Sequence, residues 1–86
     1  MNKKRAIAVL VSQKDKLNNS YQLGDFIWLH STRHYIEQIF TKESESFVLL
    51  SSFRPIDSQD TLYNETVSKL NKMFDEWTEM IESGAF

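Results

Sequence analysis

Apolar residues recur at every third or fourth position through the C-terminal third of this 86-residue chain. This spacing is the period of one face of an α-helix. The face consists of Tyr63, Val67, Leu70, Phe74, Trp77 and Ile81, with Met73 and Met80 beside them. The spacing therefore predicts one long amphipathic helix within residues 57–84, and the rest of the chain must provide a surface that covers its apolar side.

Sequence signals mark both ends of this helix. Pro55 restricts the backbone of the residue before it to extended conformations, so the preceding element should end there. Asp57 or Ser58 can cap the helix N-terminus, because a short polar side chain accepts a hydrogen bond from an unpaired backbone N–H. Gly84 can adopt the left-handed conformation that follows many helices. The helix is expected to span about residues 58–83, which is about 39 Å at 1.5 Å per residue.

Three other segments carry patterns that are typical of strands. Segment 5–13 alternates β-branched and other apolar residues, segment 25–29 alternates large apolar residues, and segment 47–53 is a short apolar run. A helix over 6–17 is the alternative for the first of them. Segment 32–41 has helical spacing and predicts a short helix, with a strand as the alternative.

Together these elements predict an α+β fold for residues 1–86 as a single domain. The expected architecture is a small, mainly antiparallel sheet of three to four strands packed by the long C-terminal amphipathic helix, with the short helix at 32–41 beside it. The hydrophobic fraction of 41% is that of a folded domain. The absence of cysteine excludes disulfides and thiolate metal sites.

The length of the predicted helix suggests self-association. A strand of about seven residues spans only about 23 Å, so a 39 Å helix would extend beyond a small sheet. Phe74, Trp77 and Ile81 lie in the part that would extend, and their spacing suits a helix–helix seam in a homodimer. The alternative is that the helix crosses the sheet diagonally and the N-terminal half of the chain covers all of it.

Four carboxylates lie near the C-terminus of the same helix, where the helix dipole disfavours negative charge. They are Asp75, Glu76, Glu79 and Glu82. We interpret this acidic set as a docking surface for a basic partner protein. A solvated helix face is the simpler interpretation, and pairing with the basic residues 3–5 is a third.

Two histidines raise the question of a metal site. His30 and His34 are four residues apart and Glu37 follows three residues later, a spacing that would place all three on one face of a helix. His30 falls at the end of a predicted strand, however, so the simpler interpretation is that both histidines are exposed or capping residues. The sequence has no GxSxG motif and no glycine-rich phosphate loop. We therefore expect no enzyme, no catalytic residue, no metal and no cofactor.

Binding of single-stranded nucleic acid is the alternative function. Basic and aromatic side chains could contact phosphates and bases, respectively. They are Lys3, Lys4, Arg5, Arg33, Lys42 and Arg54, with Trp28, Tyr35 and Phe53 as the aromatic set. The net charge of −2 argues against this alternative, because nucleic-acid-binding domains are usually basic.

No apolar run approaches the 18 or so residues that span a bilayer, and we expect no membrane association. The basic start of the chain resembles a signal peptide, but its apolar stretch is only about six residues and charged residues 14–16 follow it. We therefore expect a cytoplasmic protein. Its size and composition are typical of small bacterial or phage regulators and inhibitors. The predicted function is a non-enzymatic regulatory or inhibitor protein that acts by protein–protein binding as a homodimer.

Overall fold

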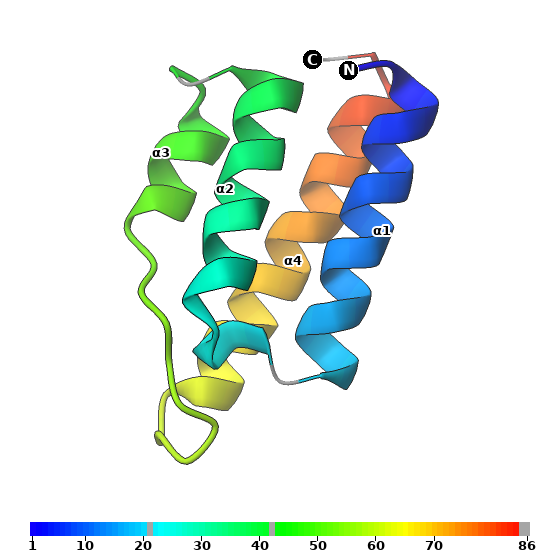
Figure 1. Ribbon diagram of the computed structural model, residues 1–86. Coiled ribbons are helices and arrows are strands. Elements are labelled where there is room, and N and C mark those ends of the chain that lie inside the picture. Colours follow the sequence, from blue (N-terminus) through cyan, green and yellow to red (C-terminus); the bar gives the residue numbers. More distant parts are fainter. Residues whose placement is uncertain (21, 42, 85–86) are drawn as a thin grey trace.

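The computed structural model describes residues 1–20, 22–41 and 43–84. In these ranges the chain forms four α-helices, one short 3-10 helix and no strand. The elements are α1 Lys3–Asn19, η1 Gln22–Gly24, α2 Phe26–Phe40, α3 Glu45–Ser51 and α4 Tyr63–Glu82. Successive α-helices run in opposite directions, so α1 and α4 are antiparallel and the start of α1 lies beside the end of α4 (Figure 1).

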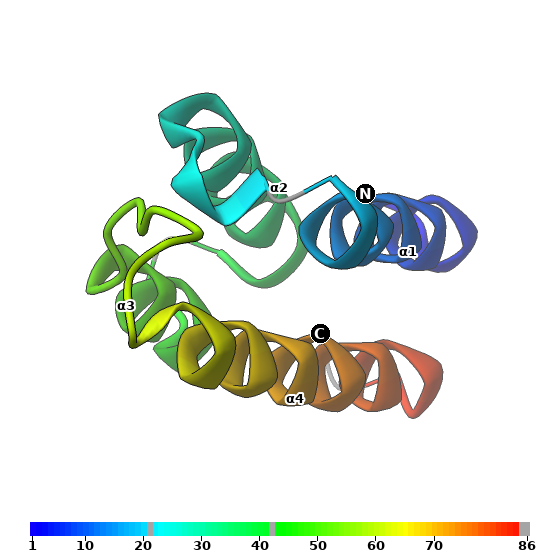
Figure 2. The same cartoon turned by 90° about the horizontal axis from the view of Figure 1, so that it is seen from below.

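The helices form two pairs. Viewed along the helices, α1 lies beside α4, and α2 lies beside α3 (Figure 2). The buried apolar side chains of all four helices and η1 form one continuous core between the pairs. The seven-residue α3 is much shorter than the twenty-residue α4, so α3 flanks only part of that helix.

The predicted α+β fold and its antiparallel sheet are wrong for the described residues. Segments 5–13, 25–29 and 47–53 were expected to be strands. The first lies in α1, the second is the N-cap and first turn of α2, and the third is most of α3 and the two residues after it. The short helix expected at 32–41 exists as the second half of α2, which ends at Phe40.

In α1 the burial pattern explains the error. The buried side chains are Ala6, Leu10, Gln13 and Leu17, which are three or four residues apart as in a helix. Ala6 is small and Gln13 is polar, so two of these four core positions carry no large apolar residue. The apolar stripe of this helix is therefore hard to recognise in the sequence. The β-branched side chain of Val11 contributed to the apparent alternation, yet it is 60% exposed.

A polar contact joins α1 to α2 inside the core. The Gln13 side-chain amide donates a hydrogen bond to the Thr32 hydroxyl at 2.8 Å. The Thr32 hydroxyl donates in turn to the main-chain carbonyl of Trp28 at 2.8 Å. The Trp28 indole N–H donates to the main-chain carbonyl of Gln13 at 3.2 Å. Because the Gln13 amide and the Thr32 hydroxyl are hydrogen-bonded to each other, these two polar residues can occupy core positions without the cost of an unpaired group.

The C-terminal helix exists as predicted, but it begins later. It starts at Tyr63 instead of about residue 58, and Leu62 at its N-cap makes no side-chain cap hydrogen bond. The carboxylate of Asp57 instead accepts from the backbone N–H of Gln59 at 2.9 Å, which stabilises a turn before the helix. Gly84 has φ of 81°, the left-handed conformation expected of it.

The shorter α4 removes the predicted excess of helix length. Its twenty residues span about 30 Å, and the seventeen residues of α1 span about 26 Å. The two helices are therefore nearly equal in length, and α1 covers α4 along most of it (Figure 1). Over the described ranges, no helix has both the length and the apolar character needed to cross a lipid bilayer.

Candidate protein-binding site

The three residues predicted to mediate self-association lie inside the core. Phe74, Trp77 and Ile81 are 1%, 3% and 0% exposed within a single chain. The Phe74 ring meets the Trp77 ring edge-on, with centroids 5.1 Å apart, and it also contacts Trp28 of α2. These side chains are not accessible to a second chain, so they give no support to a homodimer.

The four carboxylates predicted as a docking surface are exposed, but they do not form one patch. Asp75 lies on the side of α4 that faces α1, where its carboxylate is 2.6 Å from the Lys14 ammonium. Glu79 lines a shallow groove on that same side, whereas Glu76 lines a different groove beside α3. Near Glu82, a cation of α1 contacts the backbone of α4: the Lys3 ammonium donates a hydrogen bond to the main-chain carbonyl oxygen of Glu82 at 3.0 Å.

Asp75→Ala is expected to lower the free energy of unfolding by no more than about 1 kcal/mol. Its partner Lys14 and Asp75 itself keep 39% and 69% of their side-chain surface exposed, and exposed ion pairs contribute about 0.2–1 kcal/mol. Urea denaturation at low and high salt measures this contribution. A loss above about 2 kcal/mol would show that this pair is a major stabilising contact between α1 and α4.

The two histidines do share an exposed side of α2, but each has a different neighbour. The ring of His30 stacks on Phe26 with centroids 6.0 Å apart. His34 lies 3.0 Å from the side-chain amide of Gln38. Among the described residues there is no group of three or more His, Cys, Asp or Glu side chains that could hold a metal ion.

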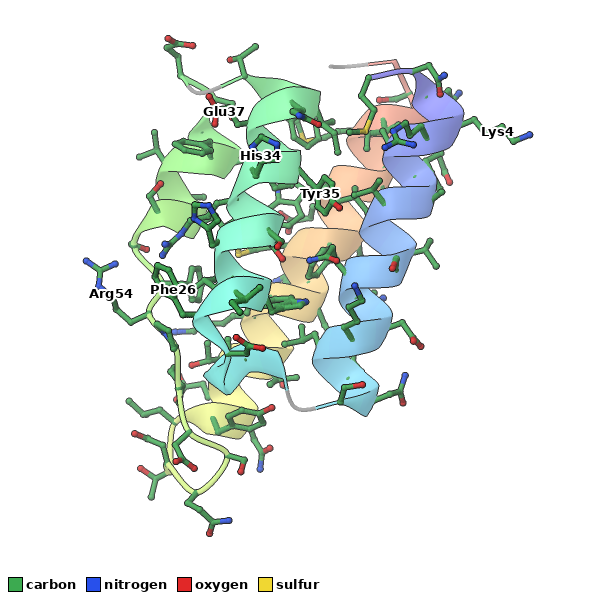
Figure 3. The ribbon with its side chains drawn as sticks, in the orientation of Figure 1. Lys4, Phe26, His34, Tyr35, Glu37 and Arg54 are labelled. Atoms are coloured by element: carbon green, nitrogen blue, oxygen red, sulfur yellow. The ribbon has the colours of Figure 1, made fainter. Side chains whose placement is uncertain are left out.

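The residues of the nucleic-acid alternative are divided between opposite flanks of the molecule. Lys4 points outward from α1 on one flank, and Arg54 points outward on the other (Figure 3). Trp28 is buried in the core and cannot stack on a base. Lys42 is outside the described residues. The described residues of the predicted set therefore form no continuous basic and aromatic surface.

Exposed apolar side chains indicate a different surface, which the sequence interpretation missed. Val48 and Leu49 of α3 are 61% and 50% exposed, although both belong to the apolar run that was predicted as a strand. The other large apolar residues that are exposed, among those that the structure describes, are Val11, Phe26, Ile27, Leu62 and Met80. Val48 and Leu49 are adjacent in the chain and protrude from the same short helix, which makes this pair a candidate contact site.

Leu49 also forms one side of a groove between α3 and α4, which we call the α3/α4 groove. It has a volume of about 350 Å³. Its lining consists of Leu49, Ser52 and Phe53 from α3 and the residues after it, and Lys69, Lys72, Met73 and Glu76 from α4. Its apolar side chains are therefore flanked by charged residues of both signs on one helix. The groove exists because the short α3 leaves part of α4 uncovered.

Two arginines hold the end of α3 that borders this groove. Arg33 of α2 donates hydrogen bonds to the carbonyl oxygens of Leu50 at 3.4 Å, Ser51 at 3.5 Å and Phe53. Arg54 donates to the Ser51 and Phe53 carbonyls at 3.1 and 3.2 Å. Carbonyls at a helix C-terminus carry partial negative charge and attract cations. Burial lowers the pKa of Arg33, and the nearby charge of Arg54 lowers it further.

Comparison of the chain with protein-family models, with curated proteins and with solved structures gives no match. The proposal for its function therefore depends on the surface of this chain alone.

Proposed function

We propose that this chain is a small, non-enzymatic regulatory or inhibitor protein that acts by binding to protein, and that the α3/α4 groove is its contact surface. The observation that supports this proposal most directly is the exposure of Leu49 at the edge of a groove with further apolar side chains in its lining, next to the exposed Val48 in the sequence. Apolar side chains gathered at a concave surface are typical of protein-binding sites.

A binding role also suits the polar side chains of the chain. The two histidines contact separate neighbours on α2, and Asp75 is paired with Lys14. We therefore assign these groups no catalytic role in this proposal, because acid–base chemistry requires groups that act together within hydrogen-bonding reach of one substrate.

A cytoplasmic location is part of the same proposal. The N-terminal segment that superficially resembles a signal peptide contributes Ala6 and Leu10 to the core, where they are 0% and 1% exposed. The burial of these two side chains in the core supports this part of the proposal.

Leu49→Ser is expected to weaken binding at the groove about tenfold. Full burial of a leucine side chain contributes about 1.5–3 kcal/mol, and about half of Leu49 remains available for burial by a partner. The measurement uses a photo-crosslinking amino acid in place of Ser52, which lines the groove, in an extract of the native host. The cross-linked species should be strong in the parent and weak in Leu49→Ser, with the urea midpoint of the two chains nearly unchanged.

The matched control carries the same cross-linker in place of Ser12, an exposed residue of α1. Equal cross-linking from Ser52 and Ser12, or from Ser52 with and without Leu49→Ser, would reject the groove as the contact surface.

A further inference from the structure

Lys69 and Glu76 occupy the same side of α4. They are seven residues apart, which is about two helical turns and 10.5 Å, and both line the α3/α4 groove. Met73 lies between them in the sequence and lines the same groove. On α4 the groove lining therefore carries two positive charges toward the start of the helix, from Lys69 and Lys72, then the apolar Met73, and then the negative charge of Glu76.

The outer two of these charges, those of Lys69 and Glu76, are complementary to their own reverse. We propose that the α3/α4 groove binds a second copy of this chain, with the two α4 helices packed antiparallel; this inference rests on the proposed function and names the partner. If the two-fold axis passes between residues 72 and 73, Lys69 of each copy faces Glu76 of the other, because positions 69 and 76 are equally far from that midpoint. A two-fold interface forms this pair twice.

The same charges select the orientation. In a parallel pair in register, Lys69 would face Lys69 and Glu76 would face Glu76, and like charges in an interface are strongly unfavourable. Among the described residues, Lys69 forms a long ion pair with Glu65, at 3.7 Å between side chains that are 65% and 61% exposed. A pair this exposed contributes little, so Lys69 can exchange Glu65 for a closer carboxylate at small cost.

The apolar part of the groove favours the same arrangement. A two-fold axis at this midpoint brings the two Met73 side chains close together and places both α3 helices on the same side of the paired α4 helices. The two Lys72 side chains lie equally near the axis, and their long, flexible stems let the ammonium groups turn apart into solvent. Leu49, which is 50% exposed at the edge of each groove, is then covered by the second copy. Methionine suits such a contact because its flexible side chain adapts to an irregular apolar surface.

Charge exchange tests the proposal with the purified chain. Sedimentation equilibrium of the parent should show a dimer whose dissociation constant rises at least about tenfold in Lys69→Glu and in Glu76→Lys, since each change creates two like-charge contacts. An equimolar mixture of the two variants should dimerise again, because an acidic α4 side then faces a basic one. The double variant Lys69→Glu/Glu76→Lys should also dimerise, since both pairs are reversed together.

Lys4→Glu is the control for a change of the same charge, since Lys4 points away from the molecule at the start of α1 (Figure 3). It should leave the dissociation constant within about twofold of the parent. A parent chain that sediments as a monomer, single variants that dimerise like the parent, or a mixture that does not recover would each overturn the proposed dimer.

These outcomes are separate from a failure of the proposed function. A monomeric chain that still gives a Leu49-dependent cross-link from Ser52 to a different protein would overturn the second copy as partner and keep the groove as a binding site. Cross-linking that does not depend on Leu49 would overturn the groove itself.

Discussion

Phe74→Ala is expected to lower the free energy of unfolding by about 3–5 kcal/mol, the usual cost of truncating a buried aromatic residue. Phe74 is 1% exposed, and its ring contacts Trp77 on its own helix and Trp28 on α2. The cavity would open where α4 meets the other helices, and a domain of 86 residues has few other contacts that could compensate. A loss of this size is a large part of the total stability of a small domain.

Phe26→Ala is the matched control because it removes the same side chain from a surface position. Phe26 is 59% exposed, so the expected loss is below about 1 kcal/mol. Urea denaturation of both variants at low protein concentration measures the difference. Nearly equal losses would contradict the burial of Phe74 in one chain, and a Phe74→Ala chain that keeps its stability while its mass falls from dimer to monomer would instead support the original prediction of self-association.

The C-terminal helix was predictable because most of its core positions carry large apolar side chains. Leu70, Phe74, Trp77 and Ile81 are buried at three- and four-residue spacing, as the sequence indicated, and Thr66 is the one small polar residue among the buried positions of the helix. The inference drawn from its length was wrong, since the helix begins at Tyr63 and α1 provides a partner of similar length. Length alone did not show whether the covering surface came from the same chain or from another.

α1 and the first part of α2 were misread as strands, and in each of these two helices a polar or small residue occupies a core position. In α2, Thr32 is 1% exposed and lies between buried Leu29 and Ile36, so the apolar stripe is interrupted in the sequence. Its burial depends on a hydrogen bond from Gln13 of α1, which no local pattern can reveal. A better signal was Asp25, whose carboxylate accepts from the backbone N–H of Ile27 at 2.8 Å and caps α2.

The candidate site was hidden for a related reason. Phe47, Val48, Leu49 and Leu50 are four consecutive apolar residues, and such a run fits a buried strand or a helix equally well. As a helix, it places Leu50 in the core and leaves Val48 and Leu49 in solvent. Ser44 offered the local evidence for the helix, because its hydroxyl accepts from the backbone N–H of Phe47 at 3.1 Å. The groove itself depends on how α3 and α4 are placed, which only the tertiary structure shows.

Arg33→Ala is expected to lower the free energy of unfolding by about 1.5–3 kcal/mol, the range for hydrogen bonds to charged groups in proteins. The guanidinium joins α2 to three carbonyl oxygens at and beyond the end of α3, two of them in partly buried contacts. Without it, these carbonyls lose a charged donor that water cannot fully replace. Urea denaturation gives the change in stability, and amide hydrogen exchange locates it.

Arg54→Ala is the control, because Arg54 donates to two of the same carbonyls from an exposed position. We expect it to cost well under half as much as Arg33→Ala, since water can replace an exposed donor. Exchange in Arg33→Ala should accelerate most at the amides of α3, such as the Val48 N–H that donates to Ser44. Because α3 forms one side of the α3/α4 groove, Arg33→Ala should also weaken Leu49-dependent cross-linking from Ser52 without changing a residue of the groove. Unchanged protection in α3, or equal losses for the two arginine variants, would show that Arg33 does not set the position of this helix.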